Sequence, residues 1–169
     1  MTNEREELRL QGSPTAPIGP KIEKAIFISY ANTGKENEYL VEAILRGFLE
    51  ILGLNVYTYK DARSSKPIIE EIRRFIRECP NCLAIFTKDI EQKTEQIGNE
   101  IWHPKLNIAD ELGGALALCH TVIIYREEGV TIPSNTASYF CRKFKNSPEK
   151  YAELLIDLLK ALKNEGIFP

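Results

Sequence analysis

The chain has 169 residues, the usual size of one domain, and its hydrophobic fraction of 43% is enough for a packed core. Its 22 basic and 24 acidic residues give a formal net charge of −2, so no long-range field favours nucleic acid or an anionic membrane. The N-terminus is charged where a signal peptide needs an apolar core, and no apolar run approaches the roughly 20 residues of a membrane span. We therefore expect a cytoplasmic protein that binds neither nucleic acid nor membranes.

Short apolar runs alternate along the chain with stretches of helical apolar spacing. Residues 1–22 are polar and then rich in glycine and proline, which predicts a flexible leader before a domain over residues 23–169. Four apolar runs predict buried strands at residues 24–30, 54–59, 82–87 and 120–125. Helical spacing predicts helices at residues 37–52, from Pro67 to just before Pro80, at 107–118 and at 148–164. The stretch 136–144 fits either a loop or a short edge strand.

Strands that alternate with helices indicate a parallel sheet covered on both faces. Right-handed crossovers leave few topologies, and the flavodoxin-like order is the simplest for about five strands. The sequence thus predicts an α/β fold with a doubly wound parallel sheet in three layers, α/β/α. A polar connection of about 17 residues ends at Pro104, and loops of this length often act as lids or binding loops.

Four cysteines in a chain without a secretion signal are expected to be free thiols. Cys79 and Cys82 form a Cys-x-x-Cys pair, which could be redox-active or half of a metal site. The second half of such a site is poor, because Cys119 and His120 are adjacent and no second pair exists. We therefore expect buried thiols and no bound metal.

In sheets of this kind, ligands bind beyond the carboxyl ends of the strands. Polar residues gather at these positions, and five of them are candidates for substrate binding: Ser29, Tyr30, Tyr59, Lys60 and Arg63. Trp102 is the only tryptophan and precedes the third predicted helix. It could pack in the core or stack on a planar ligand.

The third predicted helix carries the clearest candidate for chemistry. On a helical wheel Asp110 lies opposite the apolar stripe, and Glu111 lies at the border of the stripe. Asn107 is expected to cap the helix, which places Glu111 in the first turn, where the helix dipole favours the ionised carboxylate. Glu111 is therefore either a catalytic carboxylate or an acid placed there by the dipole. Gly113 and Gly114 each cost about 1 kcal/mol inside a helix, which indicates the close approach of a ligand or of another element.

Three segments, taken in order, resemble TIR (Toll/interleukin-1 receptor) domains of the NAD-cleaving type found in bacteria and archaea. They are Phe27 to Tyr30 in the first strand, Asn107 to Leu118 in the third helix, and Glu128 to Ser134 after the fourth strand. The resemblance covers about residues 24–145. It implies that Glu111 is the catalytic glutamate and that residues 60–66 form a loop that gates the site and mediates self-association. Many family members place a tryptophan four residues before the glutamate, whereas this chain has Asn107 there and Trp102 nine residues before. Asn107 and Trp102 are further candidates for substrate binding.

The resemblance also implies that NAD, or a related nucleotide, is the substrate, with no further cofactor. The nicotinamide nitrogen of NAD is already cationic, so it leaves as a neutral molecule without a general acid. An ionised carboxylate can then stabilise the ribosyl cation. Capture by water gives ADP-ribose, and capture by an adenine nitrogen gives a cyclic product. By the same resemblance the protein would act in microbial defence against phage and pass its signal to a separately encoded effector.

Two other functions fit the same residues. A nucleoside 2-deoxyribosyltransferase-like enzyme carries a glutamate nucleophile in a similar helix and also cleaves an N-glycosidic bond, so Glu111 would retain a role. The segment Phe27 to Tyr30 fits that enzyme poorly. A non-enzymatic TIR-like adaptor would instead use residues 60–66 and the sheet edges to bind protein partners, and Glu111 would have no chemical role.

Overall fold

Five parallel strands form the central sheet, in the order β2-β1-β3-β6-β7. Their bounds are Ala25–Tyr30 (β1), Asn55–Tyr57 (β2), Asn81–Phe86 (β3), Thr121–Glu127 (β6) and Cys141–Phe144 (β7). This is the flavodoxin-like order, so the predicted doubly wound parallel sheet is confirmed. The ambiguous stretch ends in β7, a short parallel edge strand.

The structure is a computed structural model that describes residues 20–32, 34–63, 65, 67–88, 93–96, 99–103, 106–132 and 139–169. The expected leader therefore lies outside the described residues up to residue 19. The last residues of the expected leader contact the domain. The Lys21 amine donates to the carbonyls of Cys79 and Leu118, and the Ile22 amide donates to the carbonyl of Glu78. Within the described residues, no helix has the length and apolar character needed to span a membrane.

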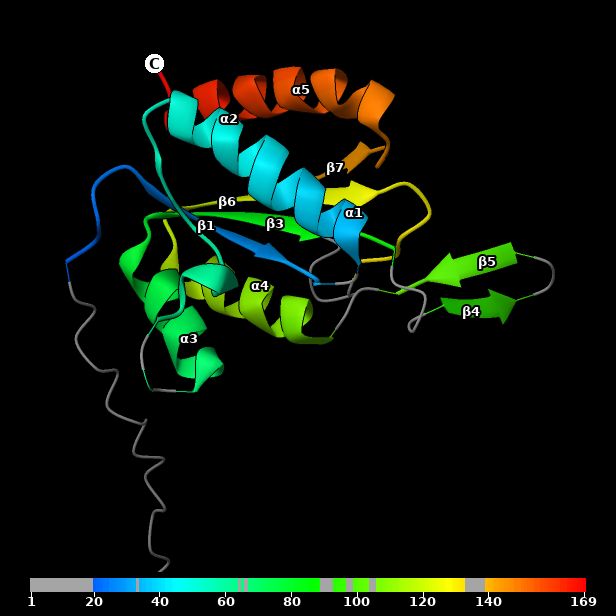
Figure 1. Cartoon of the computed structure of the whole chain (residues 1–169), viewed down its shortest axis with the longest axis horizontal. Helices are drawn as coiled ribbons and strands as arrows, with labels where there is room; N and C mark the ends of the chain where they lie inside the picture. Colours follow the sequence, from blue (N-terminus) through cyan, green and yellow to red (C-terminus); the bar gives the residue numbers. More distant parts are fainter. Residues whose placement is uncertain are drawn as a thin grey trace, which may run out of the picture.

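Helices cover both faces of the sheet (Figure 1). One face carries a helical run made of α1 (Lys35–Glu38), a π-helical segment (Tyr39–Leu45) and α2 (Arg46–Ile51), with α5 (Tyr151–Asn164) beside it. The opposite face carries α3 (Ile68–Glu78) and α4 (Leu106–Leu118). Two 3₁₀ turns lie at Tyr59–Asp61 and Pro148–Lys150. The layers are thus the predicted α/β/α.

Alternation of side chains along β1 decides which of its residues can meet α3 and α4. Ile26, Ile28 and Tyr30 pack into the core on the α2 and α5 side, whereas Phe27 packs against α3. Ser29 lies on the same side as Phe27, where it is buried and contacts α4. The first strand thus delivers a buried hydroxyl to the face that carries the candidate glutamate.

The polar connection after β3 contains an antiparallel hairpin, formed by β4 (Lys93–Gln96) and β5 (Asn99–Trp102). The hairpin projects beyond the main sheet (Figure 1). Its base is held by a parallel bridge between Trp102 and Val130 and by a hydrogen bond of 2.8 Å from the Thr131 amide to the Trp102 carbonyl. The sequence did not predict these strands, because most of their residues are polar and show no apolar alternation.

All four cysteines lie in the described residues and are free thiols. Cys79 and Cys82 are buried, and burial raises the pKa of Cys79 to about 12 and the pKa of Cys82 well above its ordinary range. No group of side chains within the described residues has the composition of a metal site. Cys79 and Cys82 are thus buried free thiols, as the sequence predicts.

We expect both thiols to be inert in the folded protein, because the thiolate is the reactive form and burial suppresses it. At pH 8 iodoacetamide should modify Cys79 and Cys82 at least ~10-fold more slowly in the folded protein than in the urea-unfolded chain, as measured by peptide mass spectrometry. Cys82→Ala should also retain turnover. Stoichiometric zinc, or fast alkylation of either thiol in the folded protein, would contradict this expectation.

Candidate active site

Glu111 is a buried carboxylic acid inside α4. It is the sixth residue of the helix and only 8% exposed. Its Oε2 accepts a hydrogen bond from the hydroxyl of Ser29, with 2.5 Å between the two oxygens. The sequence analysis selected Ser29 by its place at the end of a strand and Glu111 by its place on a helical wheel. The structure brings the two side chains together at the carboxyl end of β1.

The start of α4 differs from the expectation in a way that changes the chemistry of Glu111. The helix begins at Leu106, so Asn107 lies inside the first turn rather than at the cap, and Glu111 lies in the second turn. Burial raises the pKa of Glu111 to about 7; the Ser29 hydrogen bond opposes this rise and the charge of Asp110 adds to it. Burial therefore favours the protonated form of Glu111, a contribution that the position of the residue near the helix start did not indicate.

A cavity of about 160 Å³ opens beside Glu111. Its polar lining consists of Tyr30, Asn32, Tyr59, Asn107 and Glu111, and its apolar lining consists of Phe27, Ile28, Ile68 and Ile72. The structure thus brings together four predicted site residues, and Ser29 joins them through its hydrogen bond. Asn32 was missed by the sequence analysis, although it follows β1 by two residues and the rule for strand ends could have selected it.

Tyr30 and Tyr59 both line this cavity, although the Tyr30 side chain packs on the α2 and α5 face of the sheet. Their ring centroids are 5.2 Å apart and their planes are tilted by 46°. The Tyr30 hydroxyl donates to Glu42 at 2.7 Å, which fixes that ring. The Tyr59 hydroxyl is buried and has no hydrogen-bond partner of acceptable geometry among the described residues. It lies beside the Tyr30 hydroxyl, whose pKa is raised by burial, by the Glu42 hydrogen bond and by this contact.

A charged network holds the start of the loop that follows β2. Arg46 donates to Asp61 at 2.9 Å and to Glu42 at 3.0 Å. Glu42 also accepts from the Thr58 hydroxyl at 2.8 Å, and Asp61 accepts from the Thr58 amide at 2.8 Å. Tyr59 follows Thr58 directly, so its backbone is tied to the helical run on the other face of the sheet. This side of the cavity is therefore formed before any ligand binds.

Three predicted site residues lie elsewhere in the described part of the chain. Lys60 is exposed and pairs with Glu38, and Arg63 is exposed; neither lines the cavity at Glu111. Trp102 packs against the core between α4 and the sheet, and the Lys88 amine lies 5.9 Å from its ring centre. Of the two roles expected for Trp102, the structure therefore shows packing.

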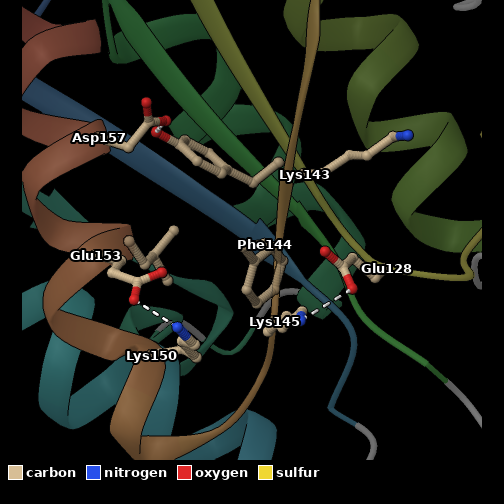
Figure 2. Close-up of a pocket in the computed structure, with 9 residues that line it drawn as sticks. Glu128, Lys143, Phe144, Lys145, Lys150, Glu153 and Asp157 are labelled. Carbon is tan, nitrogen blue, oxygen red and sulfur yellow. Dashed lines mark hydrogen bonds and ion pairs between the residues drawn. The ribbon is translucent and has the colours of Figure 1, made fainter.

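A separate cavity of about 330 Å³ lies among β6, β7 and α5 (Figure 2). Lys150 pairs there with Glu153 at 2.5 Å and Lys145 with Glu128 at 3.9 Å, while Lys143 extends away from both pairs (Figure 2). Two of the three lysines that line this cavity are therefore paired with carboxylates of the protein itself. Glu111 does not line it. The candidate active site is therefore the cavity at Glu111.

Solved structures with a similar fold include a TIR domain and a 2-deoxyribosyltransferase. The TIR domain of the Toll-related receptor TRR-2 from Hydra magnipapillata matches with a TM-score of 0.56 at 12% identity, covering 82% of this chain and 97% of that chain. A 2-deoxyribosyltransferase from Bacillus psychrosaccharolyticus matches with a TM-score of 0.55 at 13% identity, covering 78% of this chain and 90% of that chain. At these identities the likeness shows the fold alone, which is that of TIR domains. No curated protein matches the sequence.

The sequence itself assigns the family. Residues 25–146, well over half of the chain, match the family model described as the TIR domain of CAP12/Pycsar effector proteins. The chain belongs to this family and is thus a TIR-domain effector in defence signalling. The TIR resemblance recognised in three sequence segments is confirmed, over almost the same residues.

Proposed function

We propose that this TIR domain is an NAD nucleosidase, which cleaves the bond between nicotinamide and ribose. The observation that supports this most directly is Glu111, a buried carboxyl group held by Ser29 in the wall of a cavity. A carboxyl group with a raised pKa beside a cavity is a typical feature of catalytic sites. The product, ADP-ribose or a cyclic form of it, would serve as a signal in microbial defence against phage and reach a separately encoded effector.

The chemistry needs one carboxylate. The bond from C1′ to nitrogen breaks with its electron pair on the nicotinamide, which starts cationic and leaves neutral. Ionised Glu111 stabilises the ribosyl cation that remains. In hydrolysis, water adds to C1′ and gives up a proton, which Glu111 can accept because its pKa of about 7 lies near neutral pH. In cyclisation, an adenine nitrogen takes the place of water.

The neighbouring residues orient the carboxylate and the sugar. The Ser29 hydroxyl holds one oxygen of Glu111, which leaves the other oxygen for the ribose. Asn32, Tyr59 and Asn107 present amide and hydroxyl groups around the same cavity. Such groups bind ribose hydroxyls, and their fixed positions hold the sugar so that C1′ faces the carboxylate.

Incubation of the purified protein with NAD, followed by mass analysis of the products, tests the proposal. Nicotinamide should appear together with ADP-ribose or its cyclic form. The shared fold of the 2-deoxyribosyltransferase favours a second candidate, transfer of a deoxyribosyl group between bases. Base exchange in a 2′-deoxynucleoside without NAD cleavage would support that activity instead. Absence of both reactions at high protein concentration would favour a non-enzymatic adaptor.

Self-association is the second part of the proposal. TIR domains self-associate, and we assign this role to residues 60–66 and the start of α3. Ile68 and Ile69 are 53% and 44% exposed there, a short distance along the chain from exposed Arg63. Exposed apolar residues that gather beside a charged rim are typical of protein interfaces. Ser64 and Lys66 of this loop lie outside the described residues.

Arg63→Glu should lower specific activity by ~10-fold at nanomolar protein and much less at high micromolar protein, since mass action restores a weakened assembly. Lys163→Glu, an equal charge reversal on the exposed end of α5, serves as the control and should show no such dependence. Activity assays across the concentration range, paired with sedimentation velocity, provide the measurement. Specific activity that stays constant from nanomolar to micromolar protein would argue against this surface.

A further inference from the structure

A groove of about 390 Å³ lies between α3 and α4, and Glu111 and Ile72 line both this groove and the smaller cavity. The carboxyl group therefore lies where the two spaces meet. Ile69, Ile76 and Leu118 give the groove an apolar wall. Groove and cavity together fall in the range of roughly 300–1,000 Å³ that small-molecule sites occupy.

The three arginines of α3 differ in their partners. Arg74 pairs with Glu71 at 2.9 Å and with Glu78 at 3.0 Å. Arg73 and Arg77 are exposed, line the groove and make no ion pair within the described part of the chain. Residues four apart lie on one face of a helix, so these two guanidinium groups are neighbours. The groove therefore has two adjacent cations along its α3 wall.

The glycine pair of α4 is not explained by packing inside the protein. A Cβ atom at Gly113 would meet nothing within 4 Å, and one at Gly114 would meet only Ile76, at an ordinary contact distance of 3.8 Å. Glycine is unfavourable inside a helix, yet alanine would fit at both positions. Gly114 lines the groove, so its missing side chain leaves space there rather than admitting another element of the fold.

We propose that this groove binds the diphosphate of the dinucleotide substrate, with Arg73 and Arg77 on the phosphates and the apolar wall against the adenine. The proposal rests on NAD cleavage at Glu111 and adds the site that holds the rest of the molecule. Arginine pairs with phosphate through two parallel hydrogen bonds, and its fixed charge matches that of the diphosphate. Asp110 also lines the groove and opposes an anion, so Asp110→Asn should tighten binding.

ADP probes the groove without any cleavage, since it carries the diphosphate and the adenine but no nicotinamide. Titration calorimetry at low salt should show at least ~10-fold weaker ADP binding for the Arg73→Gln, Arg77→Gln double variant. Arg74→Gln is the control on the same helix and should change the affinity less than ~2-fold, because its partners are on the protein. Equal ADP affinity in the wild type and the double variant overturns the proposal, as does no binding at millimolar ADP.

The glycines give an independent test with a matched control. Gly114→Ala places a methyl group in the groove, whereas Gly113→Ala places the same group outside it, and both changes favour the helix. ADP binding should weaken in Gly114→Ala alone. Equal affinities in the two alanine variants would show that open space at Gly114 has no part in binding.

Glu111→Gln separates this proposal from the proposed function, since it should lose NAD cleavage and bind ADP at least as tightly as the wild type, because it removes a negative charge from the groove. ADP held through the two arginines by a wild-type protein that does not cleave NAD would support the groove and refute the proposed function alone. NAD cleavage with an unchanged KM in the double variant would refute the groove alone.

Discussion

Replacing Glu111 by glutamine should lower NAD cleavage at pH 8 by at least ~10²-fold, comparable to the loss of one preorganised group that stabilises the transition state. Glutamine keeps the size of the side chain and can still accept the hydrogen bond from Ser29. What is lost is the charge that stabilises the ribosyl cation and, with it, the ability to accept the proton from water. The measurement is the initial rate of nicotinamide release at saturating NAD, with folding checked by circular dichroism.

Asp110→Asn is the matched control, since Asp110 precedes Glu111 in the same helix but is exposed. The charge of Asp110 raises the pKa of Glu111, so its removal should leave turnover intact at pH 8 and raise it slightly near pH 7. A similar loss in both variants would indicate a general need for acidic residues on α4. Full activity in Glu111→Gln would show that another residue is the catalytic one.

The fold follows from the sequence where burial leaves a periodic signal. β1 and β3 are buried on both faces, so each is a mostly apolar run, typical of a central parallel strand, with Ser29 and Asn81 as buried polar exceptions. The hairpin of β4 and β5 leaves no such signal, because its sequence is mostly polar and it projects beyond the main sheet (Figure 1). Its strands are held by backbone hydrogen bonds and by the contact at Trp102, which composition does not reveal.

The candidate site was predictable in part. A helical wheel places Glu111 at the border of the apolar stripe, but its burial depends on how closely the sheet and α3 cover α4, which periodicity does not specify. The upward pKa shift therefore could not be predicted. Arg73 and Arg77 were missed for a related reason. On a helix they resemble ordinary solvated arginines, and only the groove between α3 and α4 distinguishes them from Arg74.

The pH dependence of cleavage is the second large effect. The pKa of Glu111 is about 7 and the ionised form is the active one, so kcat/KM should rise roughly tenfold from pH 6 to pH 8. In the bound complex the cationic nicotinamide favours the carboxylate, so kcat should reach its plateau at lower pH than kcat/KM. Ser29→Ala removes the hydrogen bond that opposes the pKa rise, and its midpoint should move to higher pH. Asp110→Asn should move the midpoint to lower pH, because it removes a charge that raises the pKa of Glu111.

The same titration should appear in protein stability, where no substrate is needed. Glu111 ionises at its ordinary value of 4.5 in the unfolded chain and near 7 in the fold, so the native state binds more protons between these values and stability falls as pH rises. This loss of stability is absent below pH 4.5, complete above pH 7, and amounts to roughly 3–4 kcal/mol at most. Glu111→Gln does not titrate, so its melting temperature should exceed that of the wild type by more at pH 8 than at pH 5. A difference that does not change with pH would show that Glu111 keeps its ordinary pKa in the fold, and the kinetic midpoint would then belong to another residue.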